Sequence, residues 1–445
     1  MQYDDLTGVL SDAIPDNGEF VVTVGPADAD IVGTDGRAIQ LAVDALARRG
    51  GGTVRVKAGE YLLHDAVRLR SNVNVIGEGP DVTVLRRGRL VWSHLAADSD
   101  MSETRIVPES TEAFLPGMAV CVWDAKRGWG LSSLPCKVRE VRGGALFLNE
   151  HLAAERLAEN DGLVANDFPL VLGVEARNVT VEGLTADAAV EDPNGVLDST
   201  RSAVVYLWRS PHCTVRNVVA KNGRGDGICF SKSSAYGTIE DCETCYNTFH
   251  GIHPGSHSAC CAVRRCHIHH NGSDGLYVCW GIRHSVFEDN DIHHNGWRIF
   301  RSGICTGHKD TDNVFARNHV YENVKHGISF RRKTLANSPH RNVLRENLIE
   351  NNGVSPDEIC EAGKGLPKEE IKGCGIYVCG MTSDLTIERN TIRETRPDAD
   401  RLQRRAVYLA PGVKRVTMIG NVMEGHAEGP VVDESGSDDH ELQEA

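Results

Sequence analysis

Aliphatic residues recur directly after a glycine along the second half of the chain, at a nearly constant interval. The successive intervals are 24, 24, 28, 24 and 48 residues. A fixed period of this length is typical of a solenoid, whose units bury their apolar faces only against their neighbours. We interpret the interval of 28 as one repeat with a four-residue insertion, and that of 48 as two repeats or as one repeat with a long loop. The pairs are Gly227-Ile228, Gly251-Ile252, Gly275-Leu276, Gly303-Ile304, Gly327-Ile328 and Gly375-Ile376.

Short runs of β-type apolar residues fill each repeat, and Asn and Gly rather than helical segments separate these runs. Asparagine tolerates left-handed backbone and bonds to nearby backbone, so it suits a tight corner. Stacked corners would form an Asn ladder with one rung every ~4.8 Å, the spacing of paired strands. The sequence therefore predicts an all-β fold, a parallel β-helix with three short strands per coil, right-handed on grounds of chirality. The corner pairs are Asn290 and Asn295, Asn318 and Asn323, and Asn347 and Asn352.

The repeat does not cover the whole chain, so we divide the sequence by pattern. Residues Thr34 to Arg49 form one amphipathic helix, which Thr34 or Asp35 could cap and three glycines end. The predicted segments are an N-terminal arm (1–32), a capping helix with the first coils (33–95), an inserted β-module or long coil loops (96–168), the main β-helix with its groove (169–432) and an acidic disordered tail (433–445).

The segment after this helix resembles a known superfamily. It reads Gly-Gly-Gly-Thr-Val, then Ala-Gly-Glu-Tyr-Leu, then Ser-Asn-Val-Asn-Val-Ile-Gly-Glu-Gly, over residues 50–79. This order is similar to the N-terminal segment of the pectate-lyase-like right-handed parallel β-helices. The resemblance implies that the helix caps the open end of the solenoid, where an exposed strand edge would invite aggregation. It also leaves Ca²⁺ as a candidate cofactor, although no cofactor is expected to be required.

Charge and cysteine content narrow the partners. The formal net charge is −14 and the pI is near 5.7, which argues against nucleic acid and anionic membrane as main partners. No run of 18 apolar residues predicts a membrane span. The 14 cysteines, several at matching repeat positions, are interpreted as small apolar residues rather than disulfides. Many thiols and the lack of a signal peptide favour the cytoplasm, or a secreted or periplasmic site if the chain is a trimmed form; a homo-oligomer is allowed.

Alignment of the repeats places polar residues in columns. The aliphatic residue should face the core, so alternation directs the glycine and the residue after the aliphatic one outward. An outward glycine would leave room for a ligand to approach the backbone. The residue before each glycine should lie at the strand entrance, close to the same face. The entrance column is Asp226, His250, Asp274, Ser302, His326 and Cys374, and the outward column is Cys229, His253, Tyr277, Cys305, Ser329 and Tyr377.

Imidazole, aromatic and basic groups surround two carboxylates on this face, which predicts a carbohydrate groove between Asp226 and Lys333. The candidate catalytic residues are His250, His253, Asp226, Asp274, Tyr277 and Arg331. The candidate substrate-binding residues are Lys232, His257, Trp280, His308, Lys309, His326, Arg332 and Lys333. We interpret His267, His269, His270, His293 and His294 as exposed turn residues on another face, with metal binding as the alternative. No other metal-ligand set is legible.

Residues 246–332 resemble the catalytic stretch of the alginate C5-epimerases, whose motif is Tyr-Gly-Phe-Asp-Pro-His. The matching segment begins His250-Gly-Ile-His-Pro-Gly and is followed by His-Asn-Gly-Ser-Asp-Gly-Leu-Tyr-Val. In this register His250 replaces the tyrosine, His253 replaces the aspartate, Pro254 is retained and Gly255 replaces the histidine. The resemblance implies a uronate-processing site at this place in the coil stack.

β-Elimination on a uronate glycan is the preferred reaction. It needs a cation to neutralise the carboxylate, a base for the C5 proton and an acid for the leaving oxygen. Neutral histidine suits the base near pH 7. The residues available are His250 or His253 as base, Tyr277 as acid, and Arg331, Arg332, Lys309 or His308 as the cation.

Glycoside hydrolysis is the first alternative. Asp226 and Asp274 share a column two coils apart, so their backbones should be ~9–10 Å apart, which allows an inverting pair. His250-Gly251 and the Arg331-Arg332-Lys333 cluster also resemble elements of the polygalacturonases. A C5-epimerase and a carbohydrate-binding β-helix without catalysis are the remaining alternatives.

Overall fold

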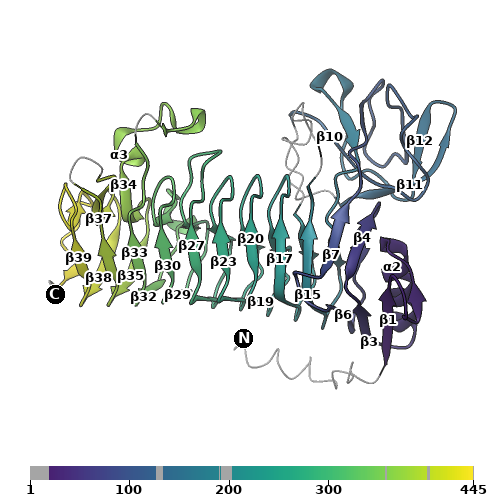
Figure 1. The fold of residues 1–445 in the computed structure, drawn as a ribbon. Coiled ribbons are helices and arrows are strands. Elements are labelled where there is room, and N and C mark those ends of the chain that lie inside the picture. Colours follow the sequence, from purple (N-terminus) through teal and green to yellow (C-terminus); the bar gives the residue numbers. More distant parts are fainter. Residues whose placement is uncertain are drawn as a thin grey trace.

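The solenoid predicted from the repeat is present as a parallel β-helix (Figure 1). The structure is a computed structural model and describes residues 20–126, 134–189, 191, 203–355, 358–397 and 401–443. One wall is a twelve-stranded parallel sheet, and a 23-stranded sheet forms the other two walls. From residue 238 onward each complete coil contributes two strands to the second sheet and one to the first, except that the coil at 276–280 contributes two short strands to the first.

The strands of the twelve-stranded sheet are β5 (Val67–Arg68), β14 (Val171–Val174), β16 (Val205–Trp208), β18 (Ile228–Ser231), β21 (Ile252–Ser256), β24 (Leu276–Tyr277), β25 (Cys279–Trp280), β28 (Ile304–Thr306), β31 (Ile328–Phe330), β34 (Gly373–Val378), β37 (Gln403–Leu409) and β40 (Val431–Asp433). Those of the 23-stranded sheet are β1 (Val21–Gly25), β2 (Ile31–Val32), β3 (Gly52–Val56), β4 (Gly59–Leu63), β6 (Val73–Gly77), β7 (Thr83–Arg87), β15 (Thr180–Asp187), β17 (Thr214–Lys221), β19 (Thr238–Glu240), β20 (Glu243–Cys245), β22 (Ala262–Arg264), β23 (His267–His269), β26 (Val286–Glu288), β27 (Asp291–His293), β29 (Val314–Ala316), β30 (His319–Tyr321), β32 (Val343–Arg345), β33 (Leu348–Glu350), β35 (Ser383–Glu388), β36 (Thr391–Arg393), β38 (Lys414–Ile419), β39 (Val422–Glu424) and β41 (Glu441–Leu442).

The glycine-aliphatic register aligns from coil to coil as predicted. Ile228 pairs with Ile252, and the column continues without a shift through Leu276 and the later aliphatic residues. Ile328 pairs directly with Ile376, so the interval of 48 is one coil that carries a long loop. The aliphatic column is fully buried, and it forms part of one continuous core along the solenoid.

Two asparagine ladders run along the interior of the corners. Side-chain amides join Asn290, Asn318, Asn347, Asn390 and Asn421 at 2.8–2.9 Å. A second ladder joins Asn247, Asn271, Asn295, Asn323, Asn352 and Gln403 at 2.9–3.1 Å. The residue with left-handed backbone is the one before each ladder asparagine, such as Asp289 (φ 57°) or Glu322 (φ 50°). The side chain of the ladder asparagine itself therefore points into the interior. The ladder is confirmed, but the asparagines turn their side chains into the core rather than supplying the turn backbone.

The repeat glycine does not face outward. A Cβ atom added at Gly251 would lie 2.5 Å from Cγ2 of Ile268 and 2.8 Å from the ladder amide of Asn271. Gly275 is crowded in the same way by Ile292 and Asn295. The glycine is therefore required by the interior packing of the ladder, and the expectation that it admits a ligand is wrong.

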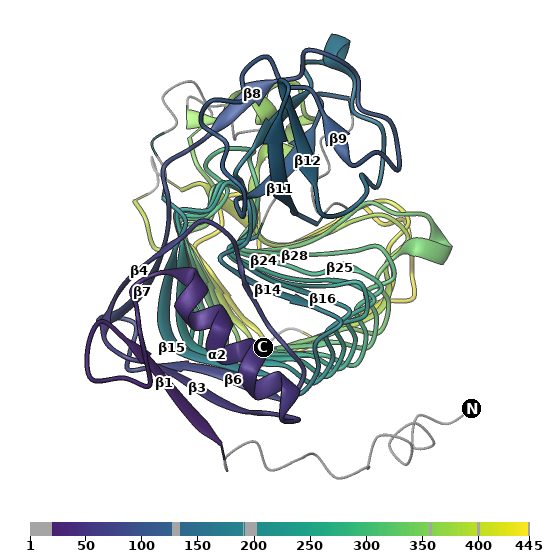
Figure 2. The same ribbon diagram turned by 90° about the vertical axis from the view of Figure 1, so that its right-hand side faces the viewer.

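Helix α2 (Gly36–Arg48) covers the N-terminal end of the solenoid (Figure 2). Asp35 is its cap, because its Oδ1 accepts hydrogen bonds from the backbone N–H groups of Arg37 and Ala38 at 3.0 Å. Ile39, Val43 and Leu46 are buried against the first coils. Within the described residues, the other helical segments are the short α3 (Lys368–Ile371) and three 3₁₀ turns at Ala158–Asn160, Leu335–Asn337 and Glu361–Gly363. None of the helices in the described part of the chain is long and apolar enough to cross a membrane.

A separate six-stranded sheet interrupts the solenoid between Trp92 and Ala165 and has its own apolar cluster. All of its strand pairings are antiparallel. It rises from the same side of the solenoid as the segment that carries α3, near the other end (Figure 1). Its strands are β8 (Trp92–His94), β9 (Arg105–Ile106), β10 (Ala119–Trp123), β11 (Cys136–Arg142), β12 (Ala145–Leu148) and β13 (Leu163–Ala165).

The two ends of the chain differ from expectation within the described residues. Strand β1 of the expected arm pairs with β3 and belongs to the first coil. In the expected disordered tail, β41 pairs with β38, Asp439 accepts a hydrogen bond from the backbone N–H of Arg415 and His440 accepts one from that of Val416. The acidic composition of the segment does not predict these contacts, because they are made by polar side chains that accept hydrogen bonds from backbone N–H groups at Arg415 and Val416. The fourteen cysteines carry free thiols, and most of them are buried.

Candidate active site

A pocket of about 400 Å³ opens on the outer surface of the twelve-stranded sheet, a size that suits a sugar-sized ligand. Strands β18 to β34 supply its floor, and the loop with α3 adds one side. The lining residues are Asp226, Ser231, Lys232, Phe249, His250, His253, Ser256, Ser273, Asp274, Tyr277, Cys279, Trp280, Ile299, Arg301, Ser302, Cys305, Lys325, His326, Ser329, Phe330, Arg331, Arg332, Glu370, Tyr377 and Cys379.

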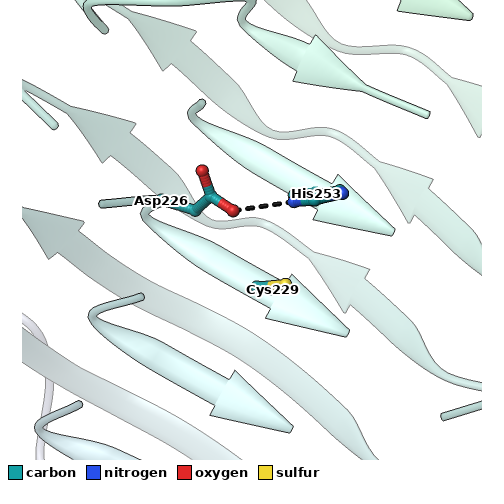
Figure 3. A group of neighbouring side chains, drawn as sticks. All are labelled: Asp226, Cys229 and His253. Carbon is teal, nitrogen blue, oxygen red and sulfur yellow. Dashed lines mark hydrogen bonds and ion pairs between the residues drawn. The ribbon is translucent and has the colours of Figure 1, made fainter. Parts of the chain in front are cut away.

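A buried carboxylate and an imidazole form a close polar contact in the pocket. Oδ2 of Asp226 lies 2.7 Å from Nδ1 of His253, and its Oδ1 accepts a hydrogen bond from the backbone N–H of His250 (Figure 3). Burial acts to raise the pKa of Asp226, but His253 and His250 outweigh it and hold that pKa below its ordinary value. Nε2 of His253 lies 3.2 Å from the carbonyl of Cys279, so each ring nitrogen faces an oxygen atom.

The Tyr277 phenol lies between an imidazole and a guanidinium. The ring of His250 stacks on it with centroids 3.8 Å apart and an interplanar angle of 3°. The Arg331 guanidinium carbon lies 4.5 Å from the centre of the same ring, and the guanidinium donates a hydrogen bond to the phenol oxygen. Nη2 of Arg331 is held by the carbonyls of Val278 and Gly307, each at 3.1 Å. Burial raises the pKa of Tyr277 although Arg331 opposes it, so the phenol keeps its proton at neutral pH.

Asp274 is the second buried carboxyl group of the pocket. Its Oδ1 accepts a hydrogen bond from the backbone N–H of Ser302 at 2.9 Å. Its Oδ2 has no hydrogen-bond partner among the described residues and lies 3.6 Å from Nδ1 of His250. Burial raises the pKa of Asp274, and Arg301 is the main group that opposes this shift.

The far end of the pocket is basic and aromatic. His326 is buried, stacks on Tyr377 at 4.6 Å, and leaves both ring nitrogens without a hydrogen-bond partner in the described part of the chain. Burial, together with Lys325 and Arg405, holds the pKa of His326 well below its ordinary value, so the ring is neutral. Lys325 lies 3.9 Å from a carboxylate oxygen of Glu370, which α3 brings to the pocket.

The pocket brings together ten of the fourteen predicted site residues: Asp226, Lys232, His250, His253, Asp274, Tyr277, Trp280, His326, Arg331 and Arg332. Four others do not line it, namely His257, His308, Lys309 and Lys333. His308 instead contacts the exposed Trp280, with ring centroids 4.8 Å apart and an interplanar angle of 35°. These four lie beyond the ends of the short strands, where the chain has turned away and strand alternation no longer predicts direction.

Other pocket residues were missed by the sequence reading. Phe249, Ser273, Arg301 and Lys325 all stand two positions before a repeat glycine, so one further column of the same alignment would have found them. Glu370 comes from the long loop of the coil before β34, and no feature of the repeat marks it. The entrance column itself is confirmed as pocket lining except at Cys374.

Ca²⁺ prefers six to eight oxygen ligands, more than the single carboxylate that each candidate metal group of the described residues offers. The groups that could hold an ion in the described residues each contain one carboxylate with cysteine or histidine. One of them is Asp226, Cys229 and His253 (Figure 3). Burial raises the pKa of Cys229 well above its ordinary value, so this sulfur is a thiol beside the contact between Asp226 and His253.

Comparisons with known proteins agree with the architecture. The family model described as "Right handed beta helix region" matches residues 203–367. Among solved structures, the A-module of mannuronan C-5 epimerase AlgE4 from Azotobacter vinelandii is 15% identical with a TM-score of 0.54, covering 92% of this chain and 97% of that one. The Dettilon tailspike protein is 15% identical with a TM-score of 0.55, covering 92% and 68%. No curated protein matches the sequence. Identities this low establish the fold alone.

Proposed function

We propose that this right-handed parallel β-helix protein is a polysaccharide lyase that cleaves a uronate-containing glycan by β-elimination. The observation that supports this best is the charge of the pocket within an acidic chain. Five cationic side chains and three carboxylates line it among the described residues: Lys232, Arg301, Lys325, Arg331 and Arg332 against Asp226, Asp274 and Glu370. The whole chain has a formal net charge of −14, so the excess of positive charge is local to the pocket. A cationic pocket favours an anionic substrate.

The stacked pair His250 and Tyr277 supplies a base and an acid for this reaction. His250 takes the C5 proton, the C4–O bond breaks as the C4–C5 double bond forms, and the Tyr277 phenol gives its proton to the leaving oxygen. The carboxylate of Asp274, 3.6 Å from Nδ1 of His250, stabilises the imidazolium that results. Lys325 and Arg301 neutralise the substrate carboxylate, which lowers the pKa of the C5 proton.

An inverting hydrolase is the second candidate, supported by the opposite pKa shifts of two carboxyl groups in one pocket. Asp274 would be the acid, because burial raises its pKa. Asp226 would be the base, because His253 and His250 lower its pKa although burial acts to raise it. Both oxygens of Asp226 are already engaged by these histidines, which leaves it poorly placed to activate water. We therefore rank hydrolysis below elimination.

The deciding experiment incubates the purified protein with uronate and neutral polysaccharides. Ultraviolet absorbance reports the unsaturated uronate ends, and a separate assay run in parallel reports the reducing ends. The product is also examined for C5 inversion by NMR. We expect both signals to rise together on a uronate polymer and neither on its methyl ester. Reducing ends without absorbance would establish the hydrolase, and C5 inversion without chain cleavage would establish an epimerase such as the epimerase that shares this fold. Binding with no product would leave a carbohydrate-binding protein.

Lys325→Met tests the anionic subsite. We expect kcat/KM on the uronate substrate to fall by about 10- to 100-fold, because a hydrogen bond to a charged group contributes ~1.5–3 kcal/mol. The matched control is Lys309→Met, an exposed lysine of a neighbouring coil that does not line the pocket and should leave kcat/KM unchanged. Equal losses in the two variants would show that the general positive field, not a subsite, attracts the substrate.

A further inference from the structure

Six histidines gather on the wall of the solenoid formed by β20, β23, β27 and β30, whereas the candidate active site lies on the twelve-stranded sheet (Figure 1). They are not turn residues alone, as the sequence suggested, since β23 begins and ends with one and β27 ends with one. We call them the histidine cluster: His267, His269, His270, His293, His294 and His319. The pairing of β23 with β27 places His267 beside Asp291 and His269 beside His293.

We propose that this cluster binds a divalent transition-metal ion through Nε2 of His267, Nε2 of His293 and the carboxylate of Asp291. The two Nε2 atoms face each other at 2.8 Å, and Nε2 of His267 lies 4.0 Å from Oδ2 of Asp291. All three ligand atoms lie within 4.8 Å of one another. Ligands of one zinc ion, each about 2.0–2.2 Å from the metal, lie at comparable separations, so small rotamer changes complete the set.

The groups behind these ligands are arranged as metal sites require. Nδ1 of His293 lies 2.7 Å from Nδ1 of His294, whose Nε2 is 3.0 Å from a carboxylate oxygen of Glu322. A ligating histidine usually donates its second N–H to such a partner, which fixes its tautomer and raises its basicity. With Nε2 of His293 on the metal, its Nδ1–H would donate to His294, and Nε2–H of His294 to Glu322.

Asp291 supplies an independent sign of an incomplete site. Its side chain is half-exposed, and its Oδ1 atom is shielded from solvent and meets no donor at hydrogen-bond geometry among the described residues. The neighbouring Tyr321 phenol interacts with the same carboxylate. Nδ1 of His319 lies 3.8 Å from that oxygen, too far for a hydrogen bond. A cation between His267, His293 and Asp291 would satisfy the carboxylate.

The ligand types indicate which ions the site would accept. Imidazole favours zinc, copper, nickel and cobalt ions over calcium or magnesium, and two imidazoles with one carboxylate leave a position for water.

Zinc titration by calorimetry, with any affinity tag removed, tests the proposal. We expect one Zn²⁺ per chain in the wild-type protein, and Co²⁺ should give the absorption bands of a four- or five-coordinate ion. His293→Gln and Asp291→Asn should each weaken Zn²⁺ binding at least ~10-fold, since even outer partners of a metal contribute 10- to 100-fold. Both residues are partly exposed, so the variants should unfold at the wild-type denaturant concentration.

Two controls separate this site from other binding. His253→Gln removes a ligand from the pocket group and should leave Zn²⁺ binding unchanged. His212→Gln removes an imidazole that stacks on Tyr236 in another coil, and it should also have no effect. Absence of wild-type Zn²⁺ binding, retention of it in His293→Gln and Asp291→Asn, or its loss in His253→Gln would each overturn the proposal. The experiment does not depend on whether the pocket is catalytic.

Discussion

Replacing Tyr277 with phenylalanine is expected to lower kcat on the uronate substrate by about 100- to 10,000-fold, the usual contribution of a general acid. The phenol has a pKa raised by burial and is protonated at neutral pH, as a proton donor must be. Phenylalanine keeps the ring that stacks on His250 at 3.8 Å, so KM should change little. Initial rates over a range of substrate concentrations separate the two constants.

Tyr377→Phe is the matched control for this prediction. Tyr377 occupies the same outward column, lines the same pocket and stacks on a histidine, His326, in the same parallel fashion. It has no guanidinium donating to its oxygen among the contacts of the described residues, in contrast to the Arg331 bond of Tyr277. We expect less than a ~10-fold loss in this control. A similar loss in both variants, or an unaffected kcat in Tyr277→Phe, would remove Tyr277 from the acid role.

The sequence predicts best those features that repeat with the strand register. Ile228 and its counterparts stack as expected, and ten predicted residues meet in one pocket because the coils repeat in register, which brings equivalent positions before, within and after each strand to the same face. Period-2 alternation failed for the repeat glycine, because Gly251 lies at an interior corner against Asn271 and not on the outer surface. Alternation describes extended backbone, and these glycines stand just before the strands begin.

Features that depend on contacts between non-repeating segments could not be predicted. Glu370 reaches Lys325 only because the long loop folds back over the sheet. The histidine cluster is similar, since two histidines in one strand indicate a site only when a second strand is placed beside them with Asp291 in register. The register was readable from the glycine column, but the direction of each histidine side chain was not.

The largest stability effect is expected from the asparagine ladder, with Asn352→Ala lowering the free energy of unfolding by about 3 kcal/mol. Asn352 is fully buried, and its Nδ2 donates to the carbonyl of Val320 at 3.0 Å and to Oε1 of Gln403 at 2.9 Å. Its Oδ1 accepts from the backbone N–H of Asn323 at 3.1 Å. Alanine would leave the Asn323 N–H buried without its acceptor, at a cost of ~1–3 kcal/mol, and would remove the side-chain hydrogen bonds to Val320 and Gln403, each of which contributes ~0.5–1.5 kcal/mol.

Asn351→Gly is the matched control, one residue away but outside the ladder. Asn351 has a φ of 56°, a conformation that glycine adopts freely, and its side chain bonds only to the exposed Thr395. Urea denaturation of both variants should show a lower midpoint for Asn352→Ala with an unchanged slope, and a shift of under ~1 kcal/mol for Asn351→Gly. Equal shifts would mean that the corner backbone, rather than the ladder amides, sets the stability. Because Gln403 continues the ladder across the coil with the long loop, a large effect at Asn352 would also show that this loop does not break the solenoid into separate cooperative units.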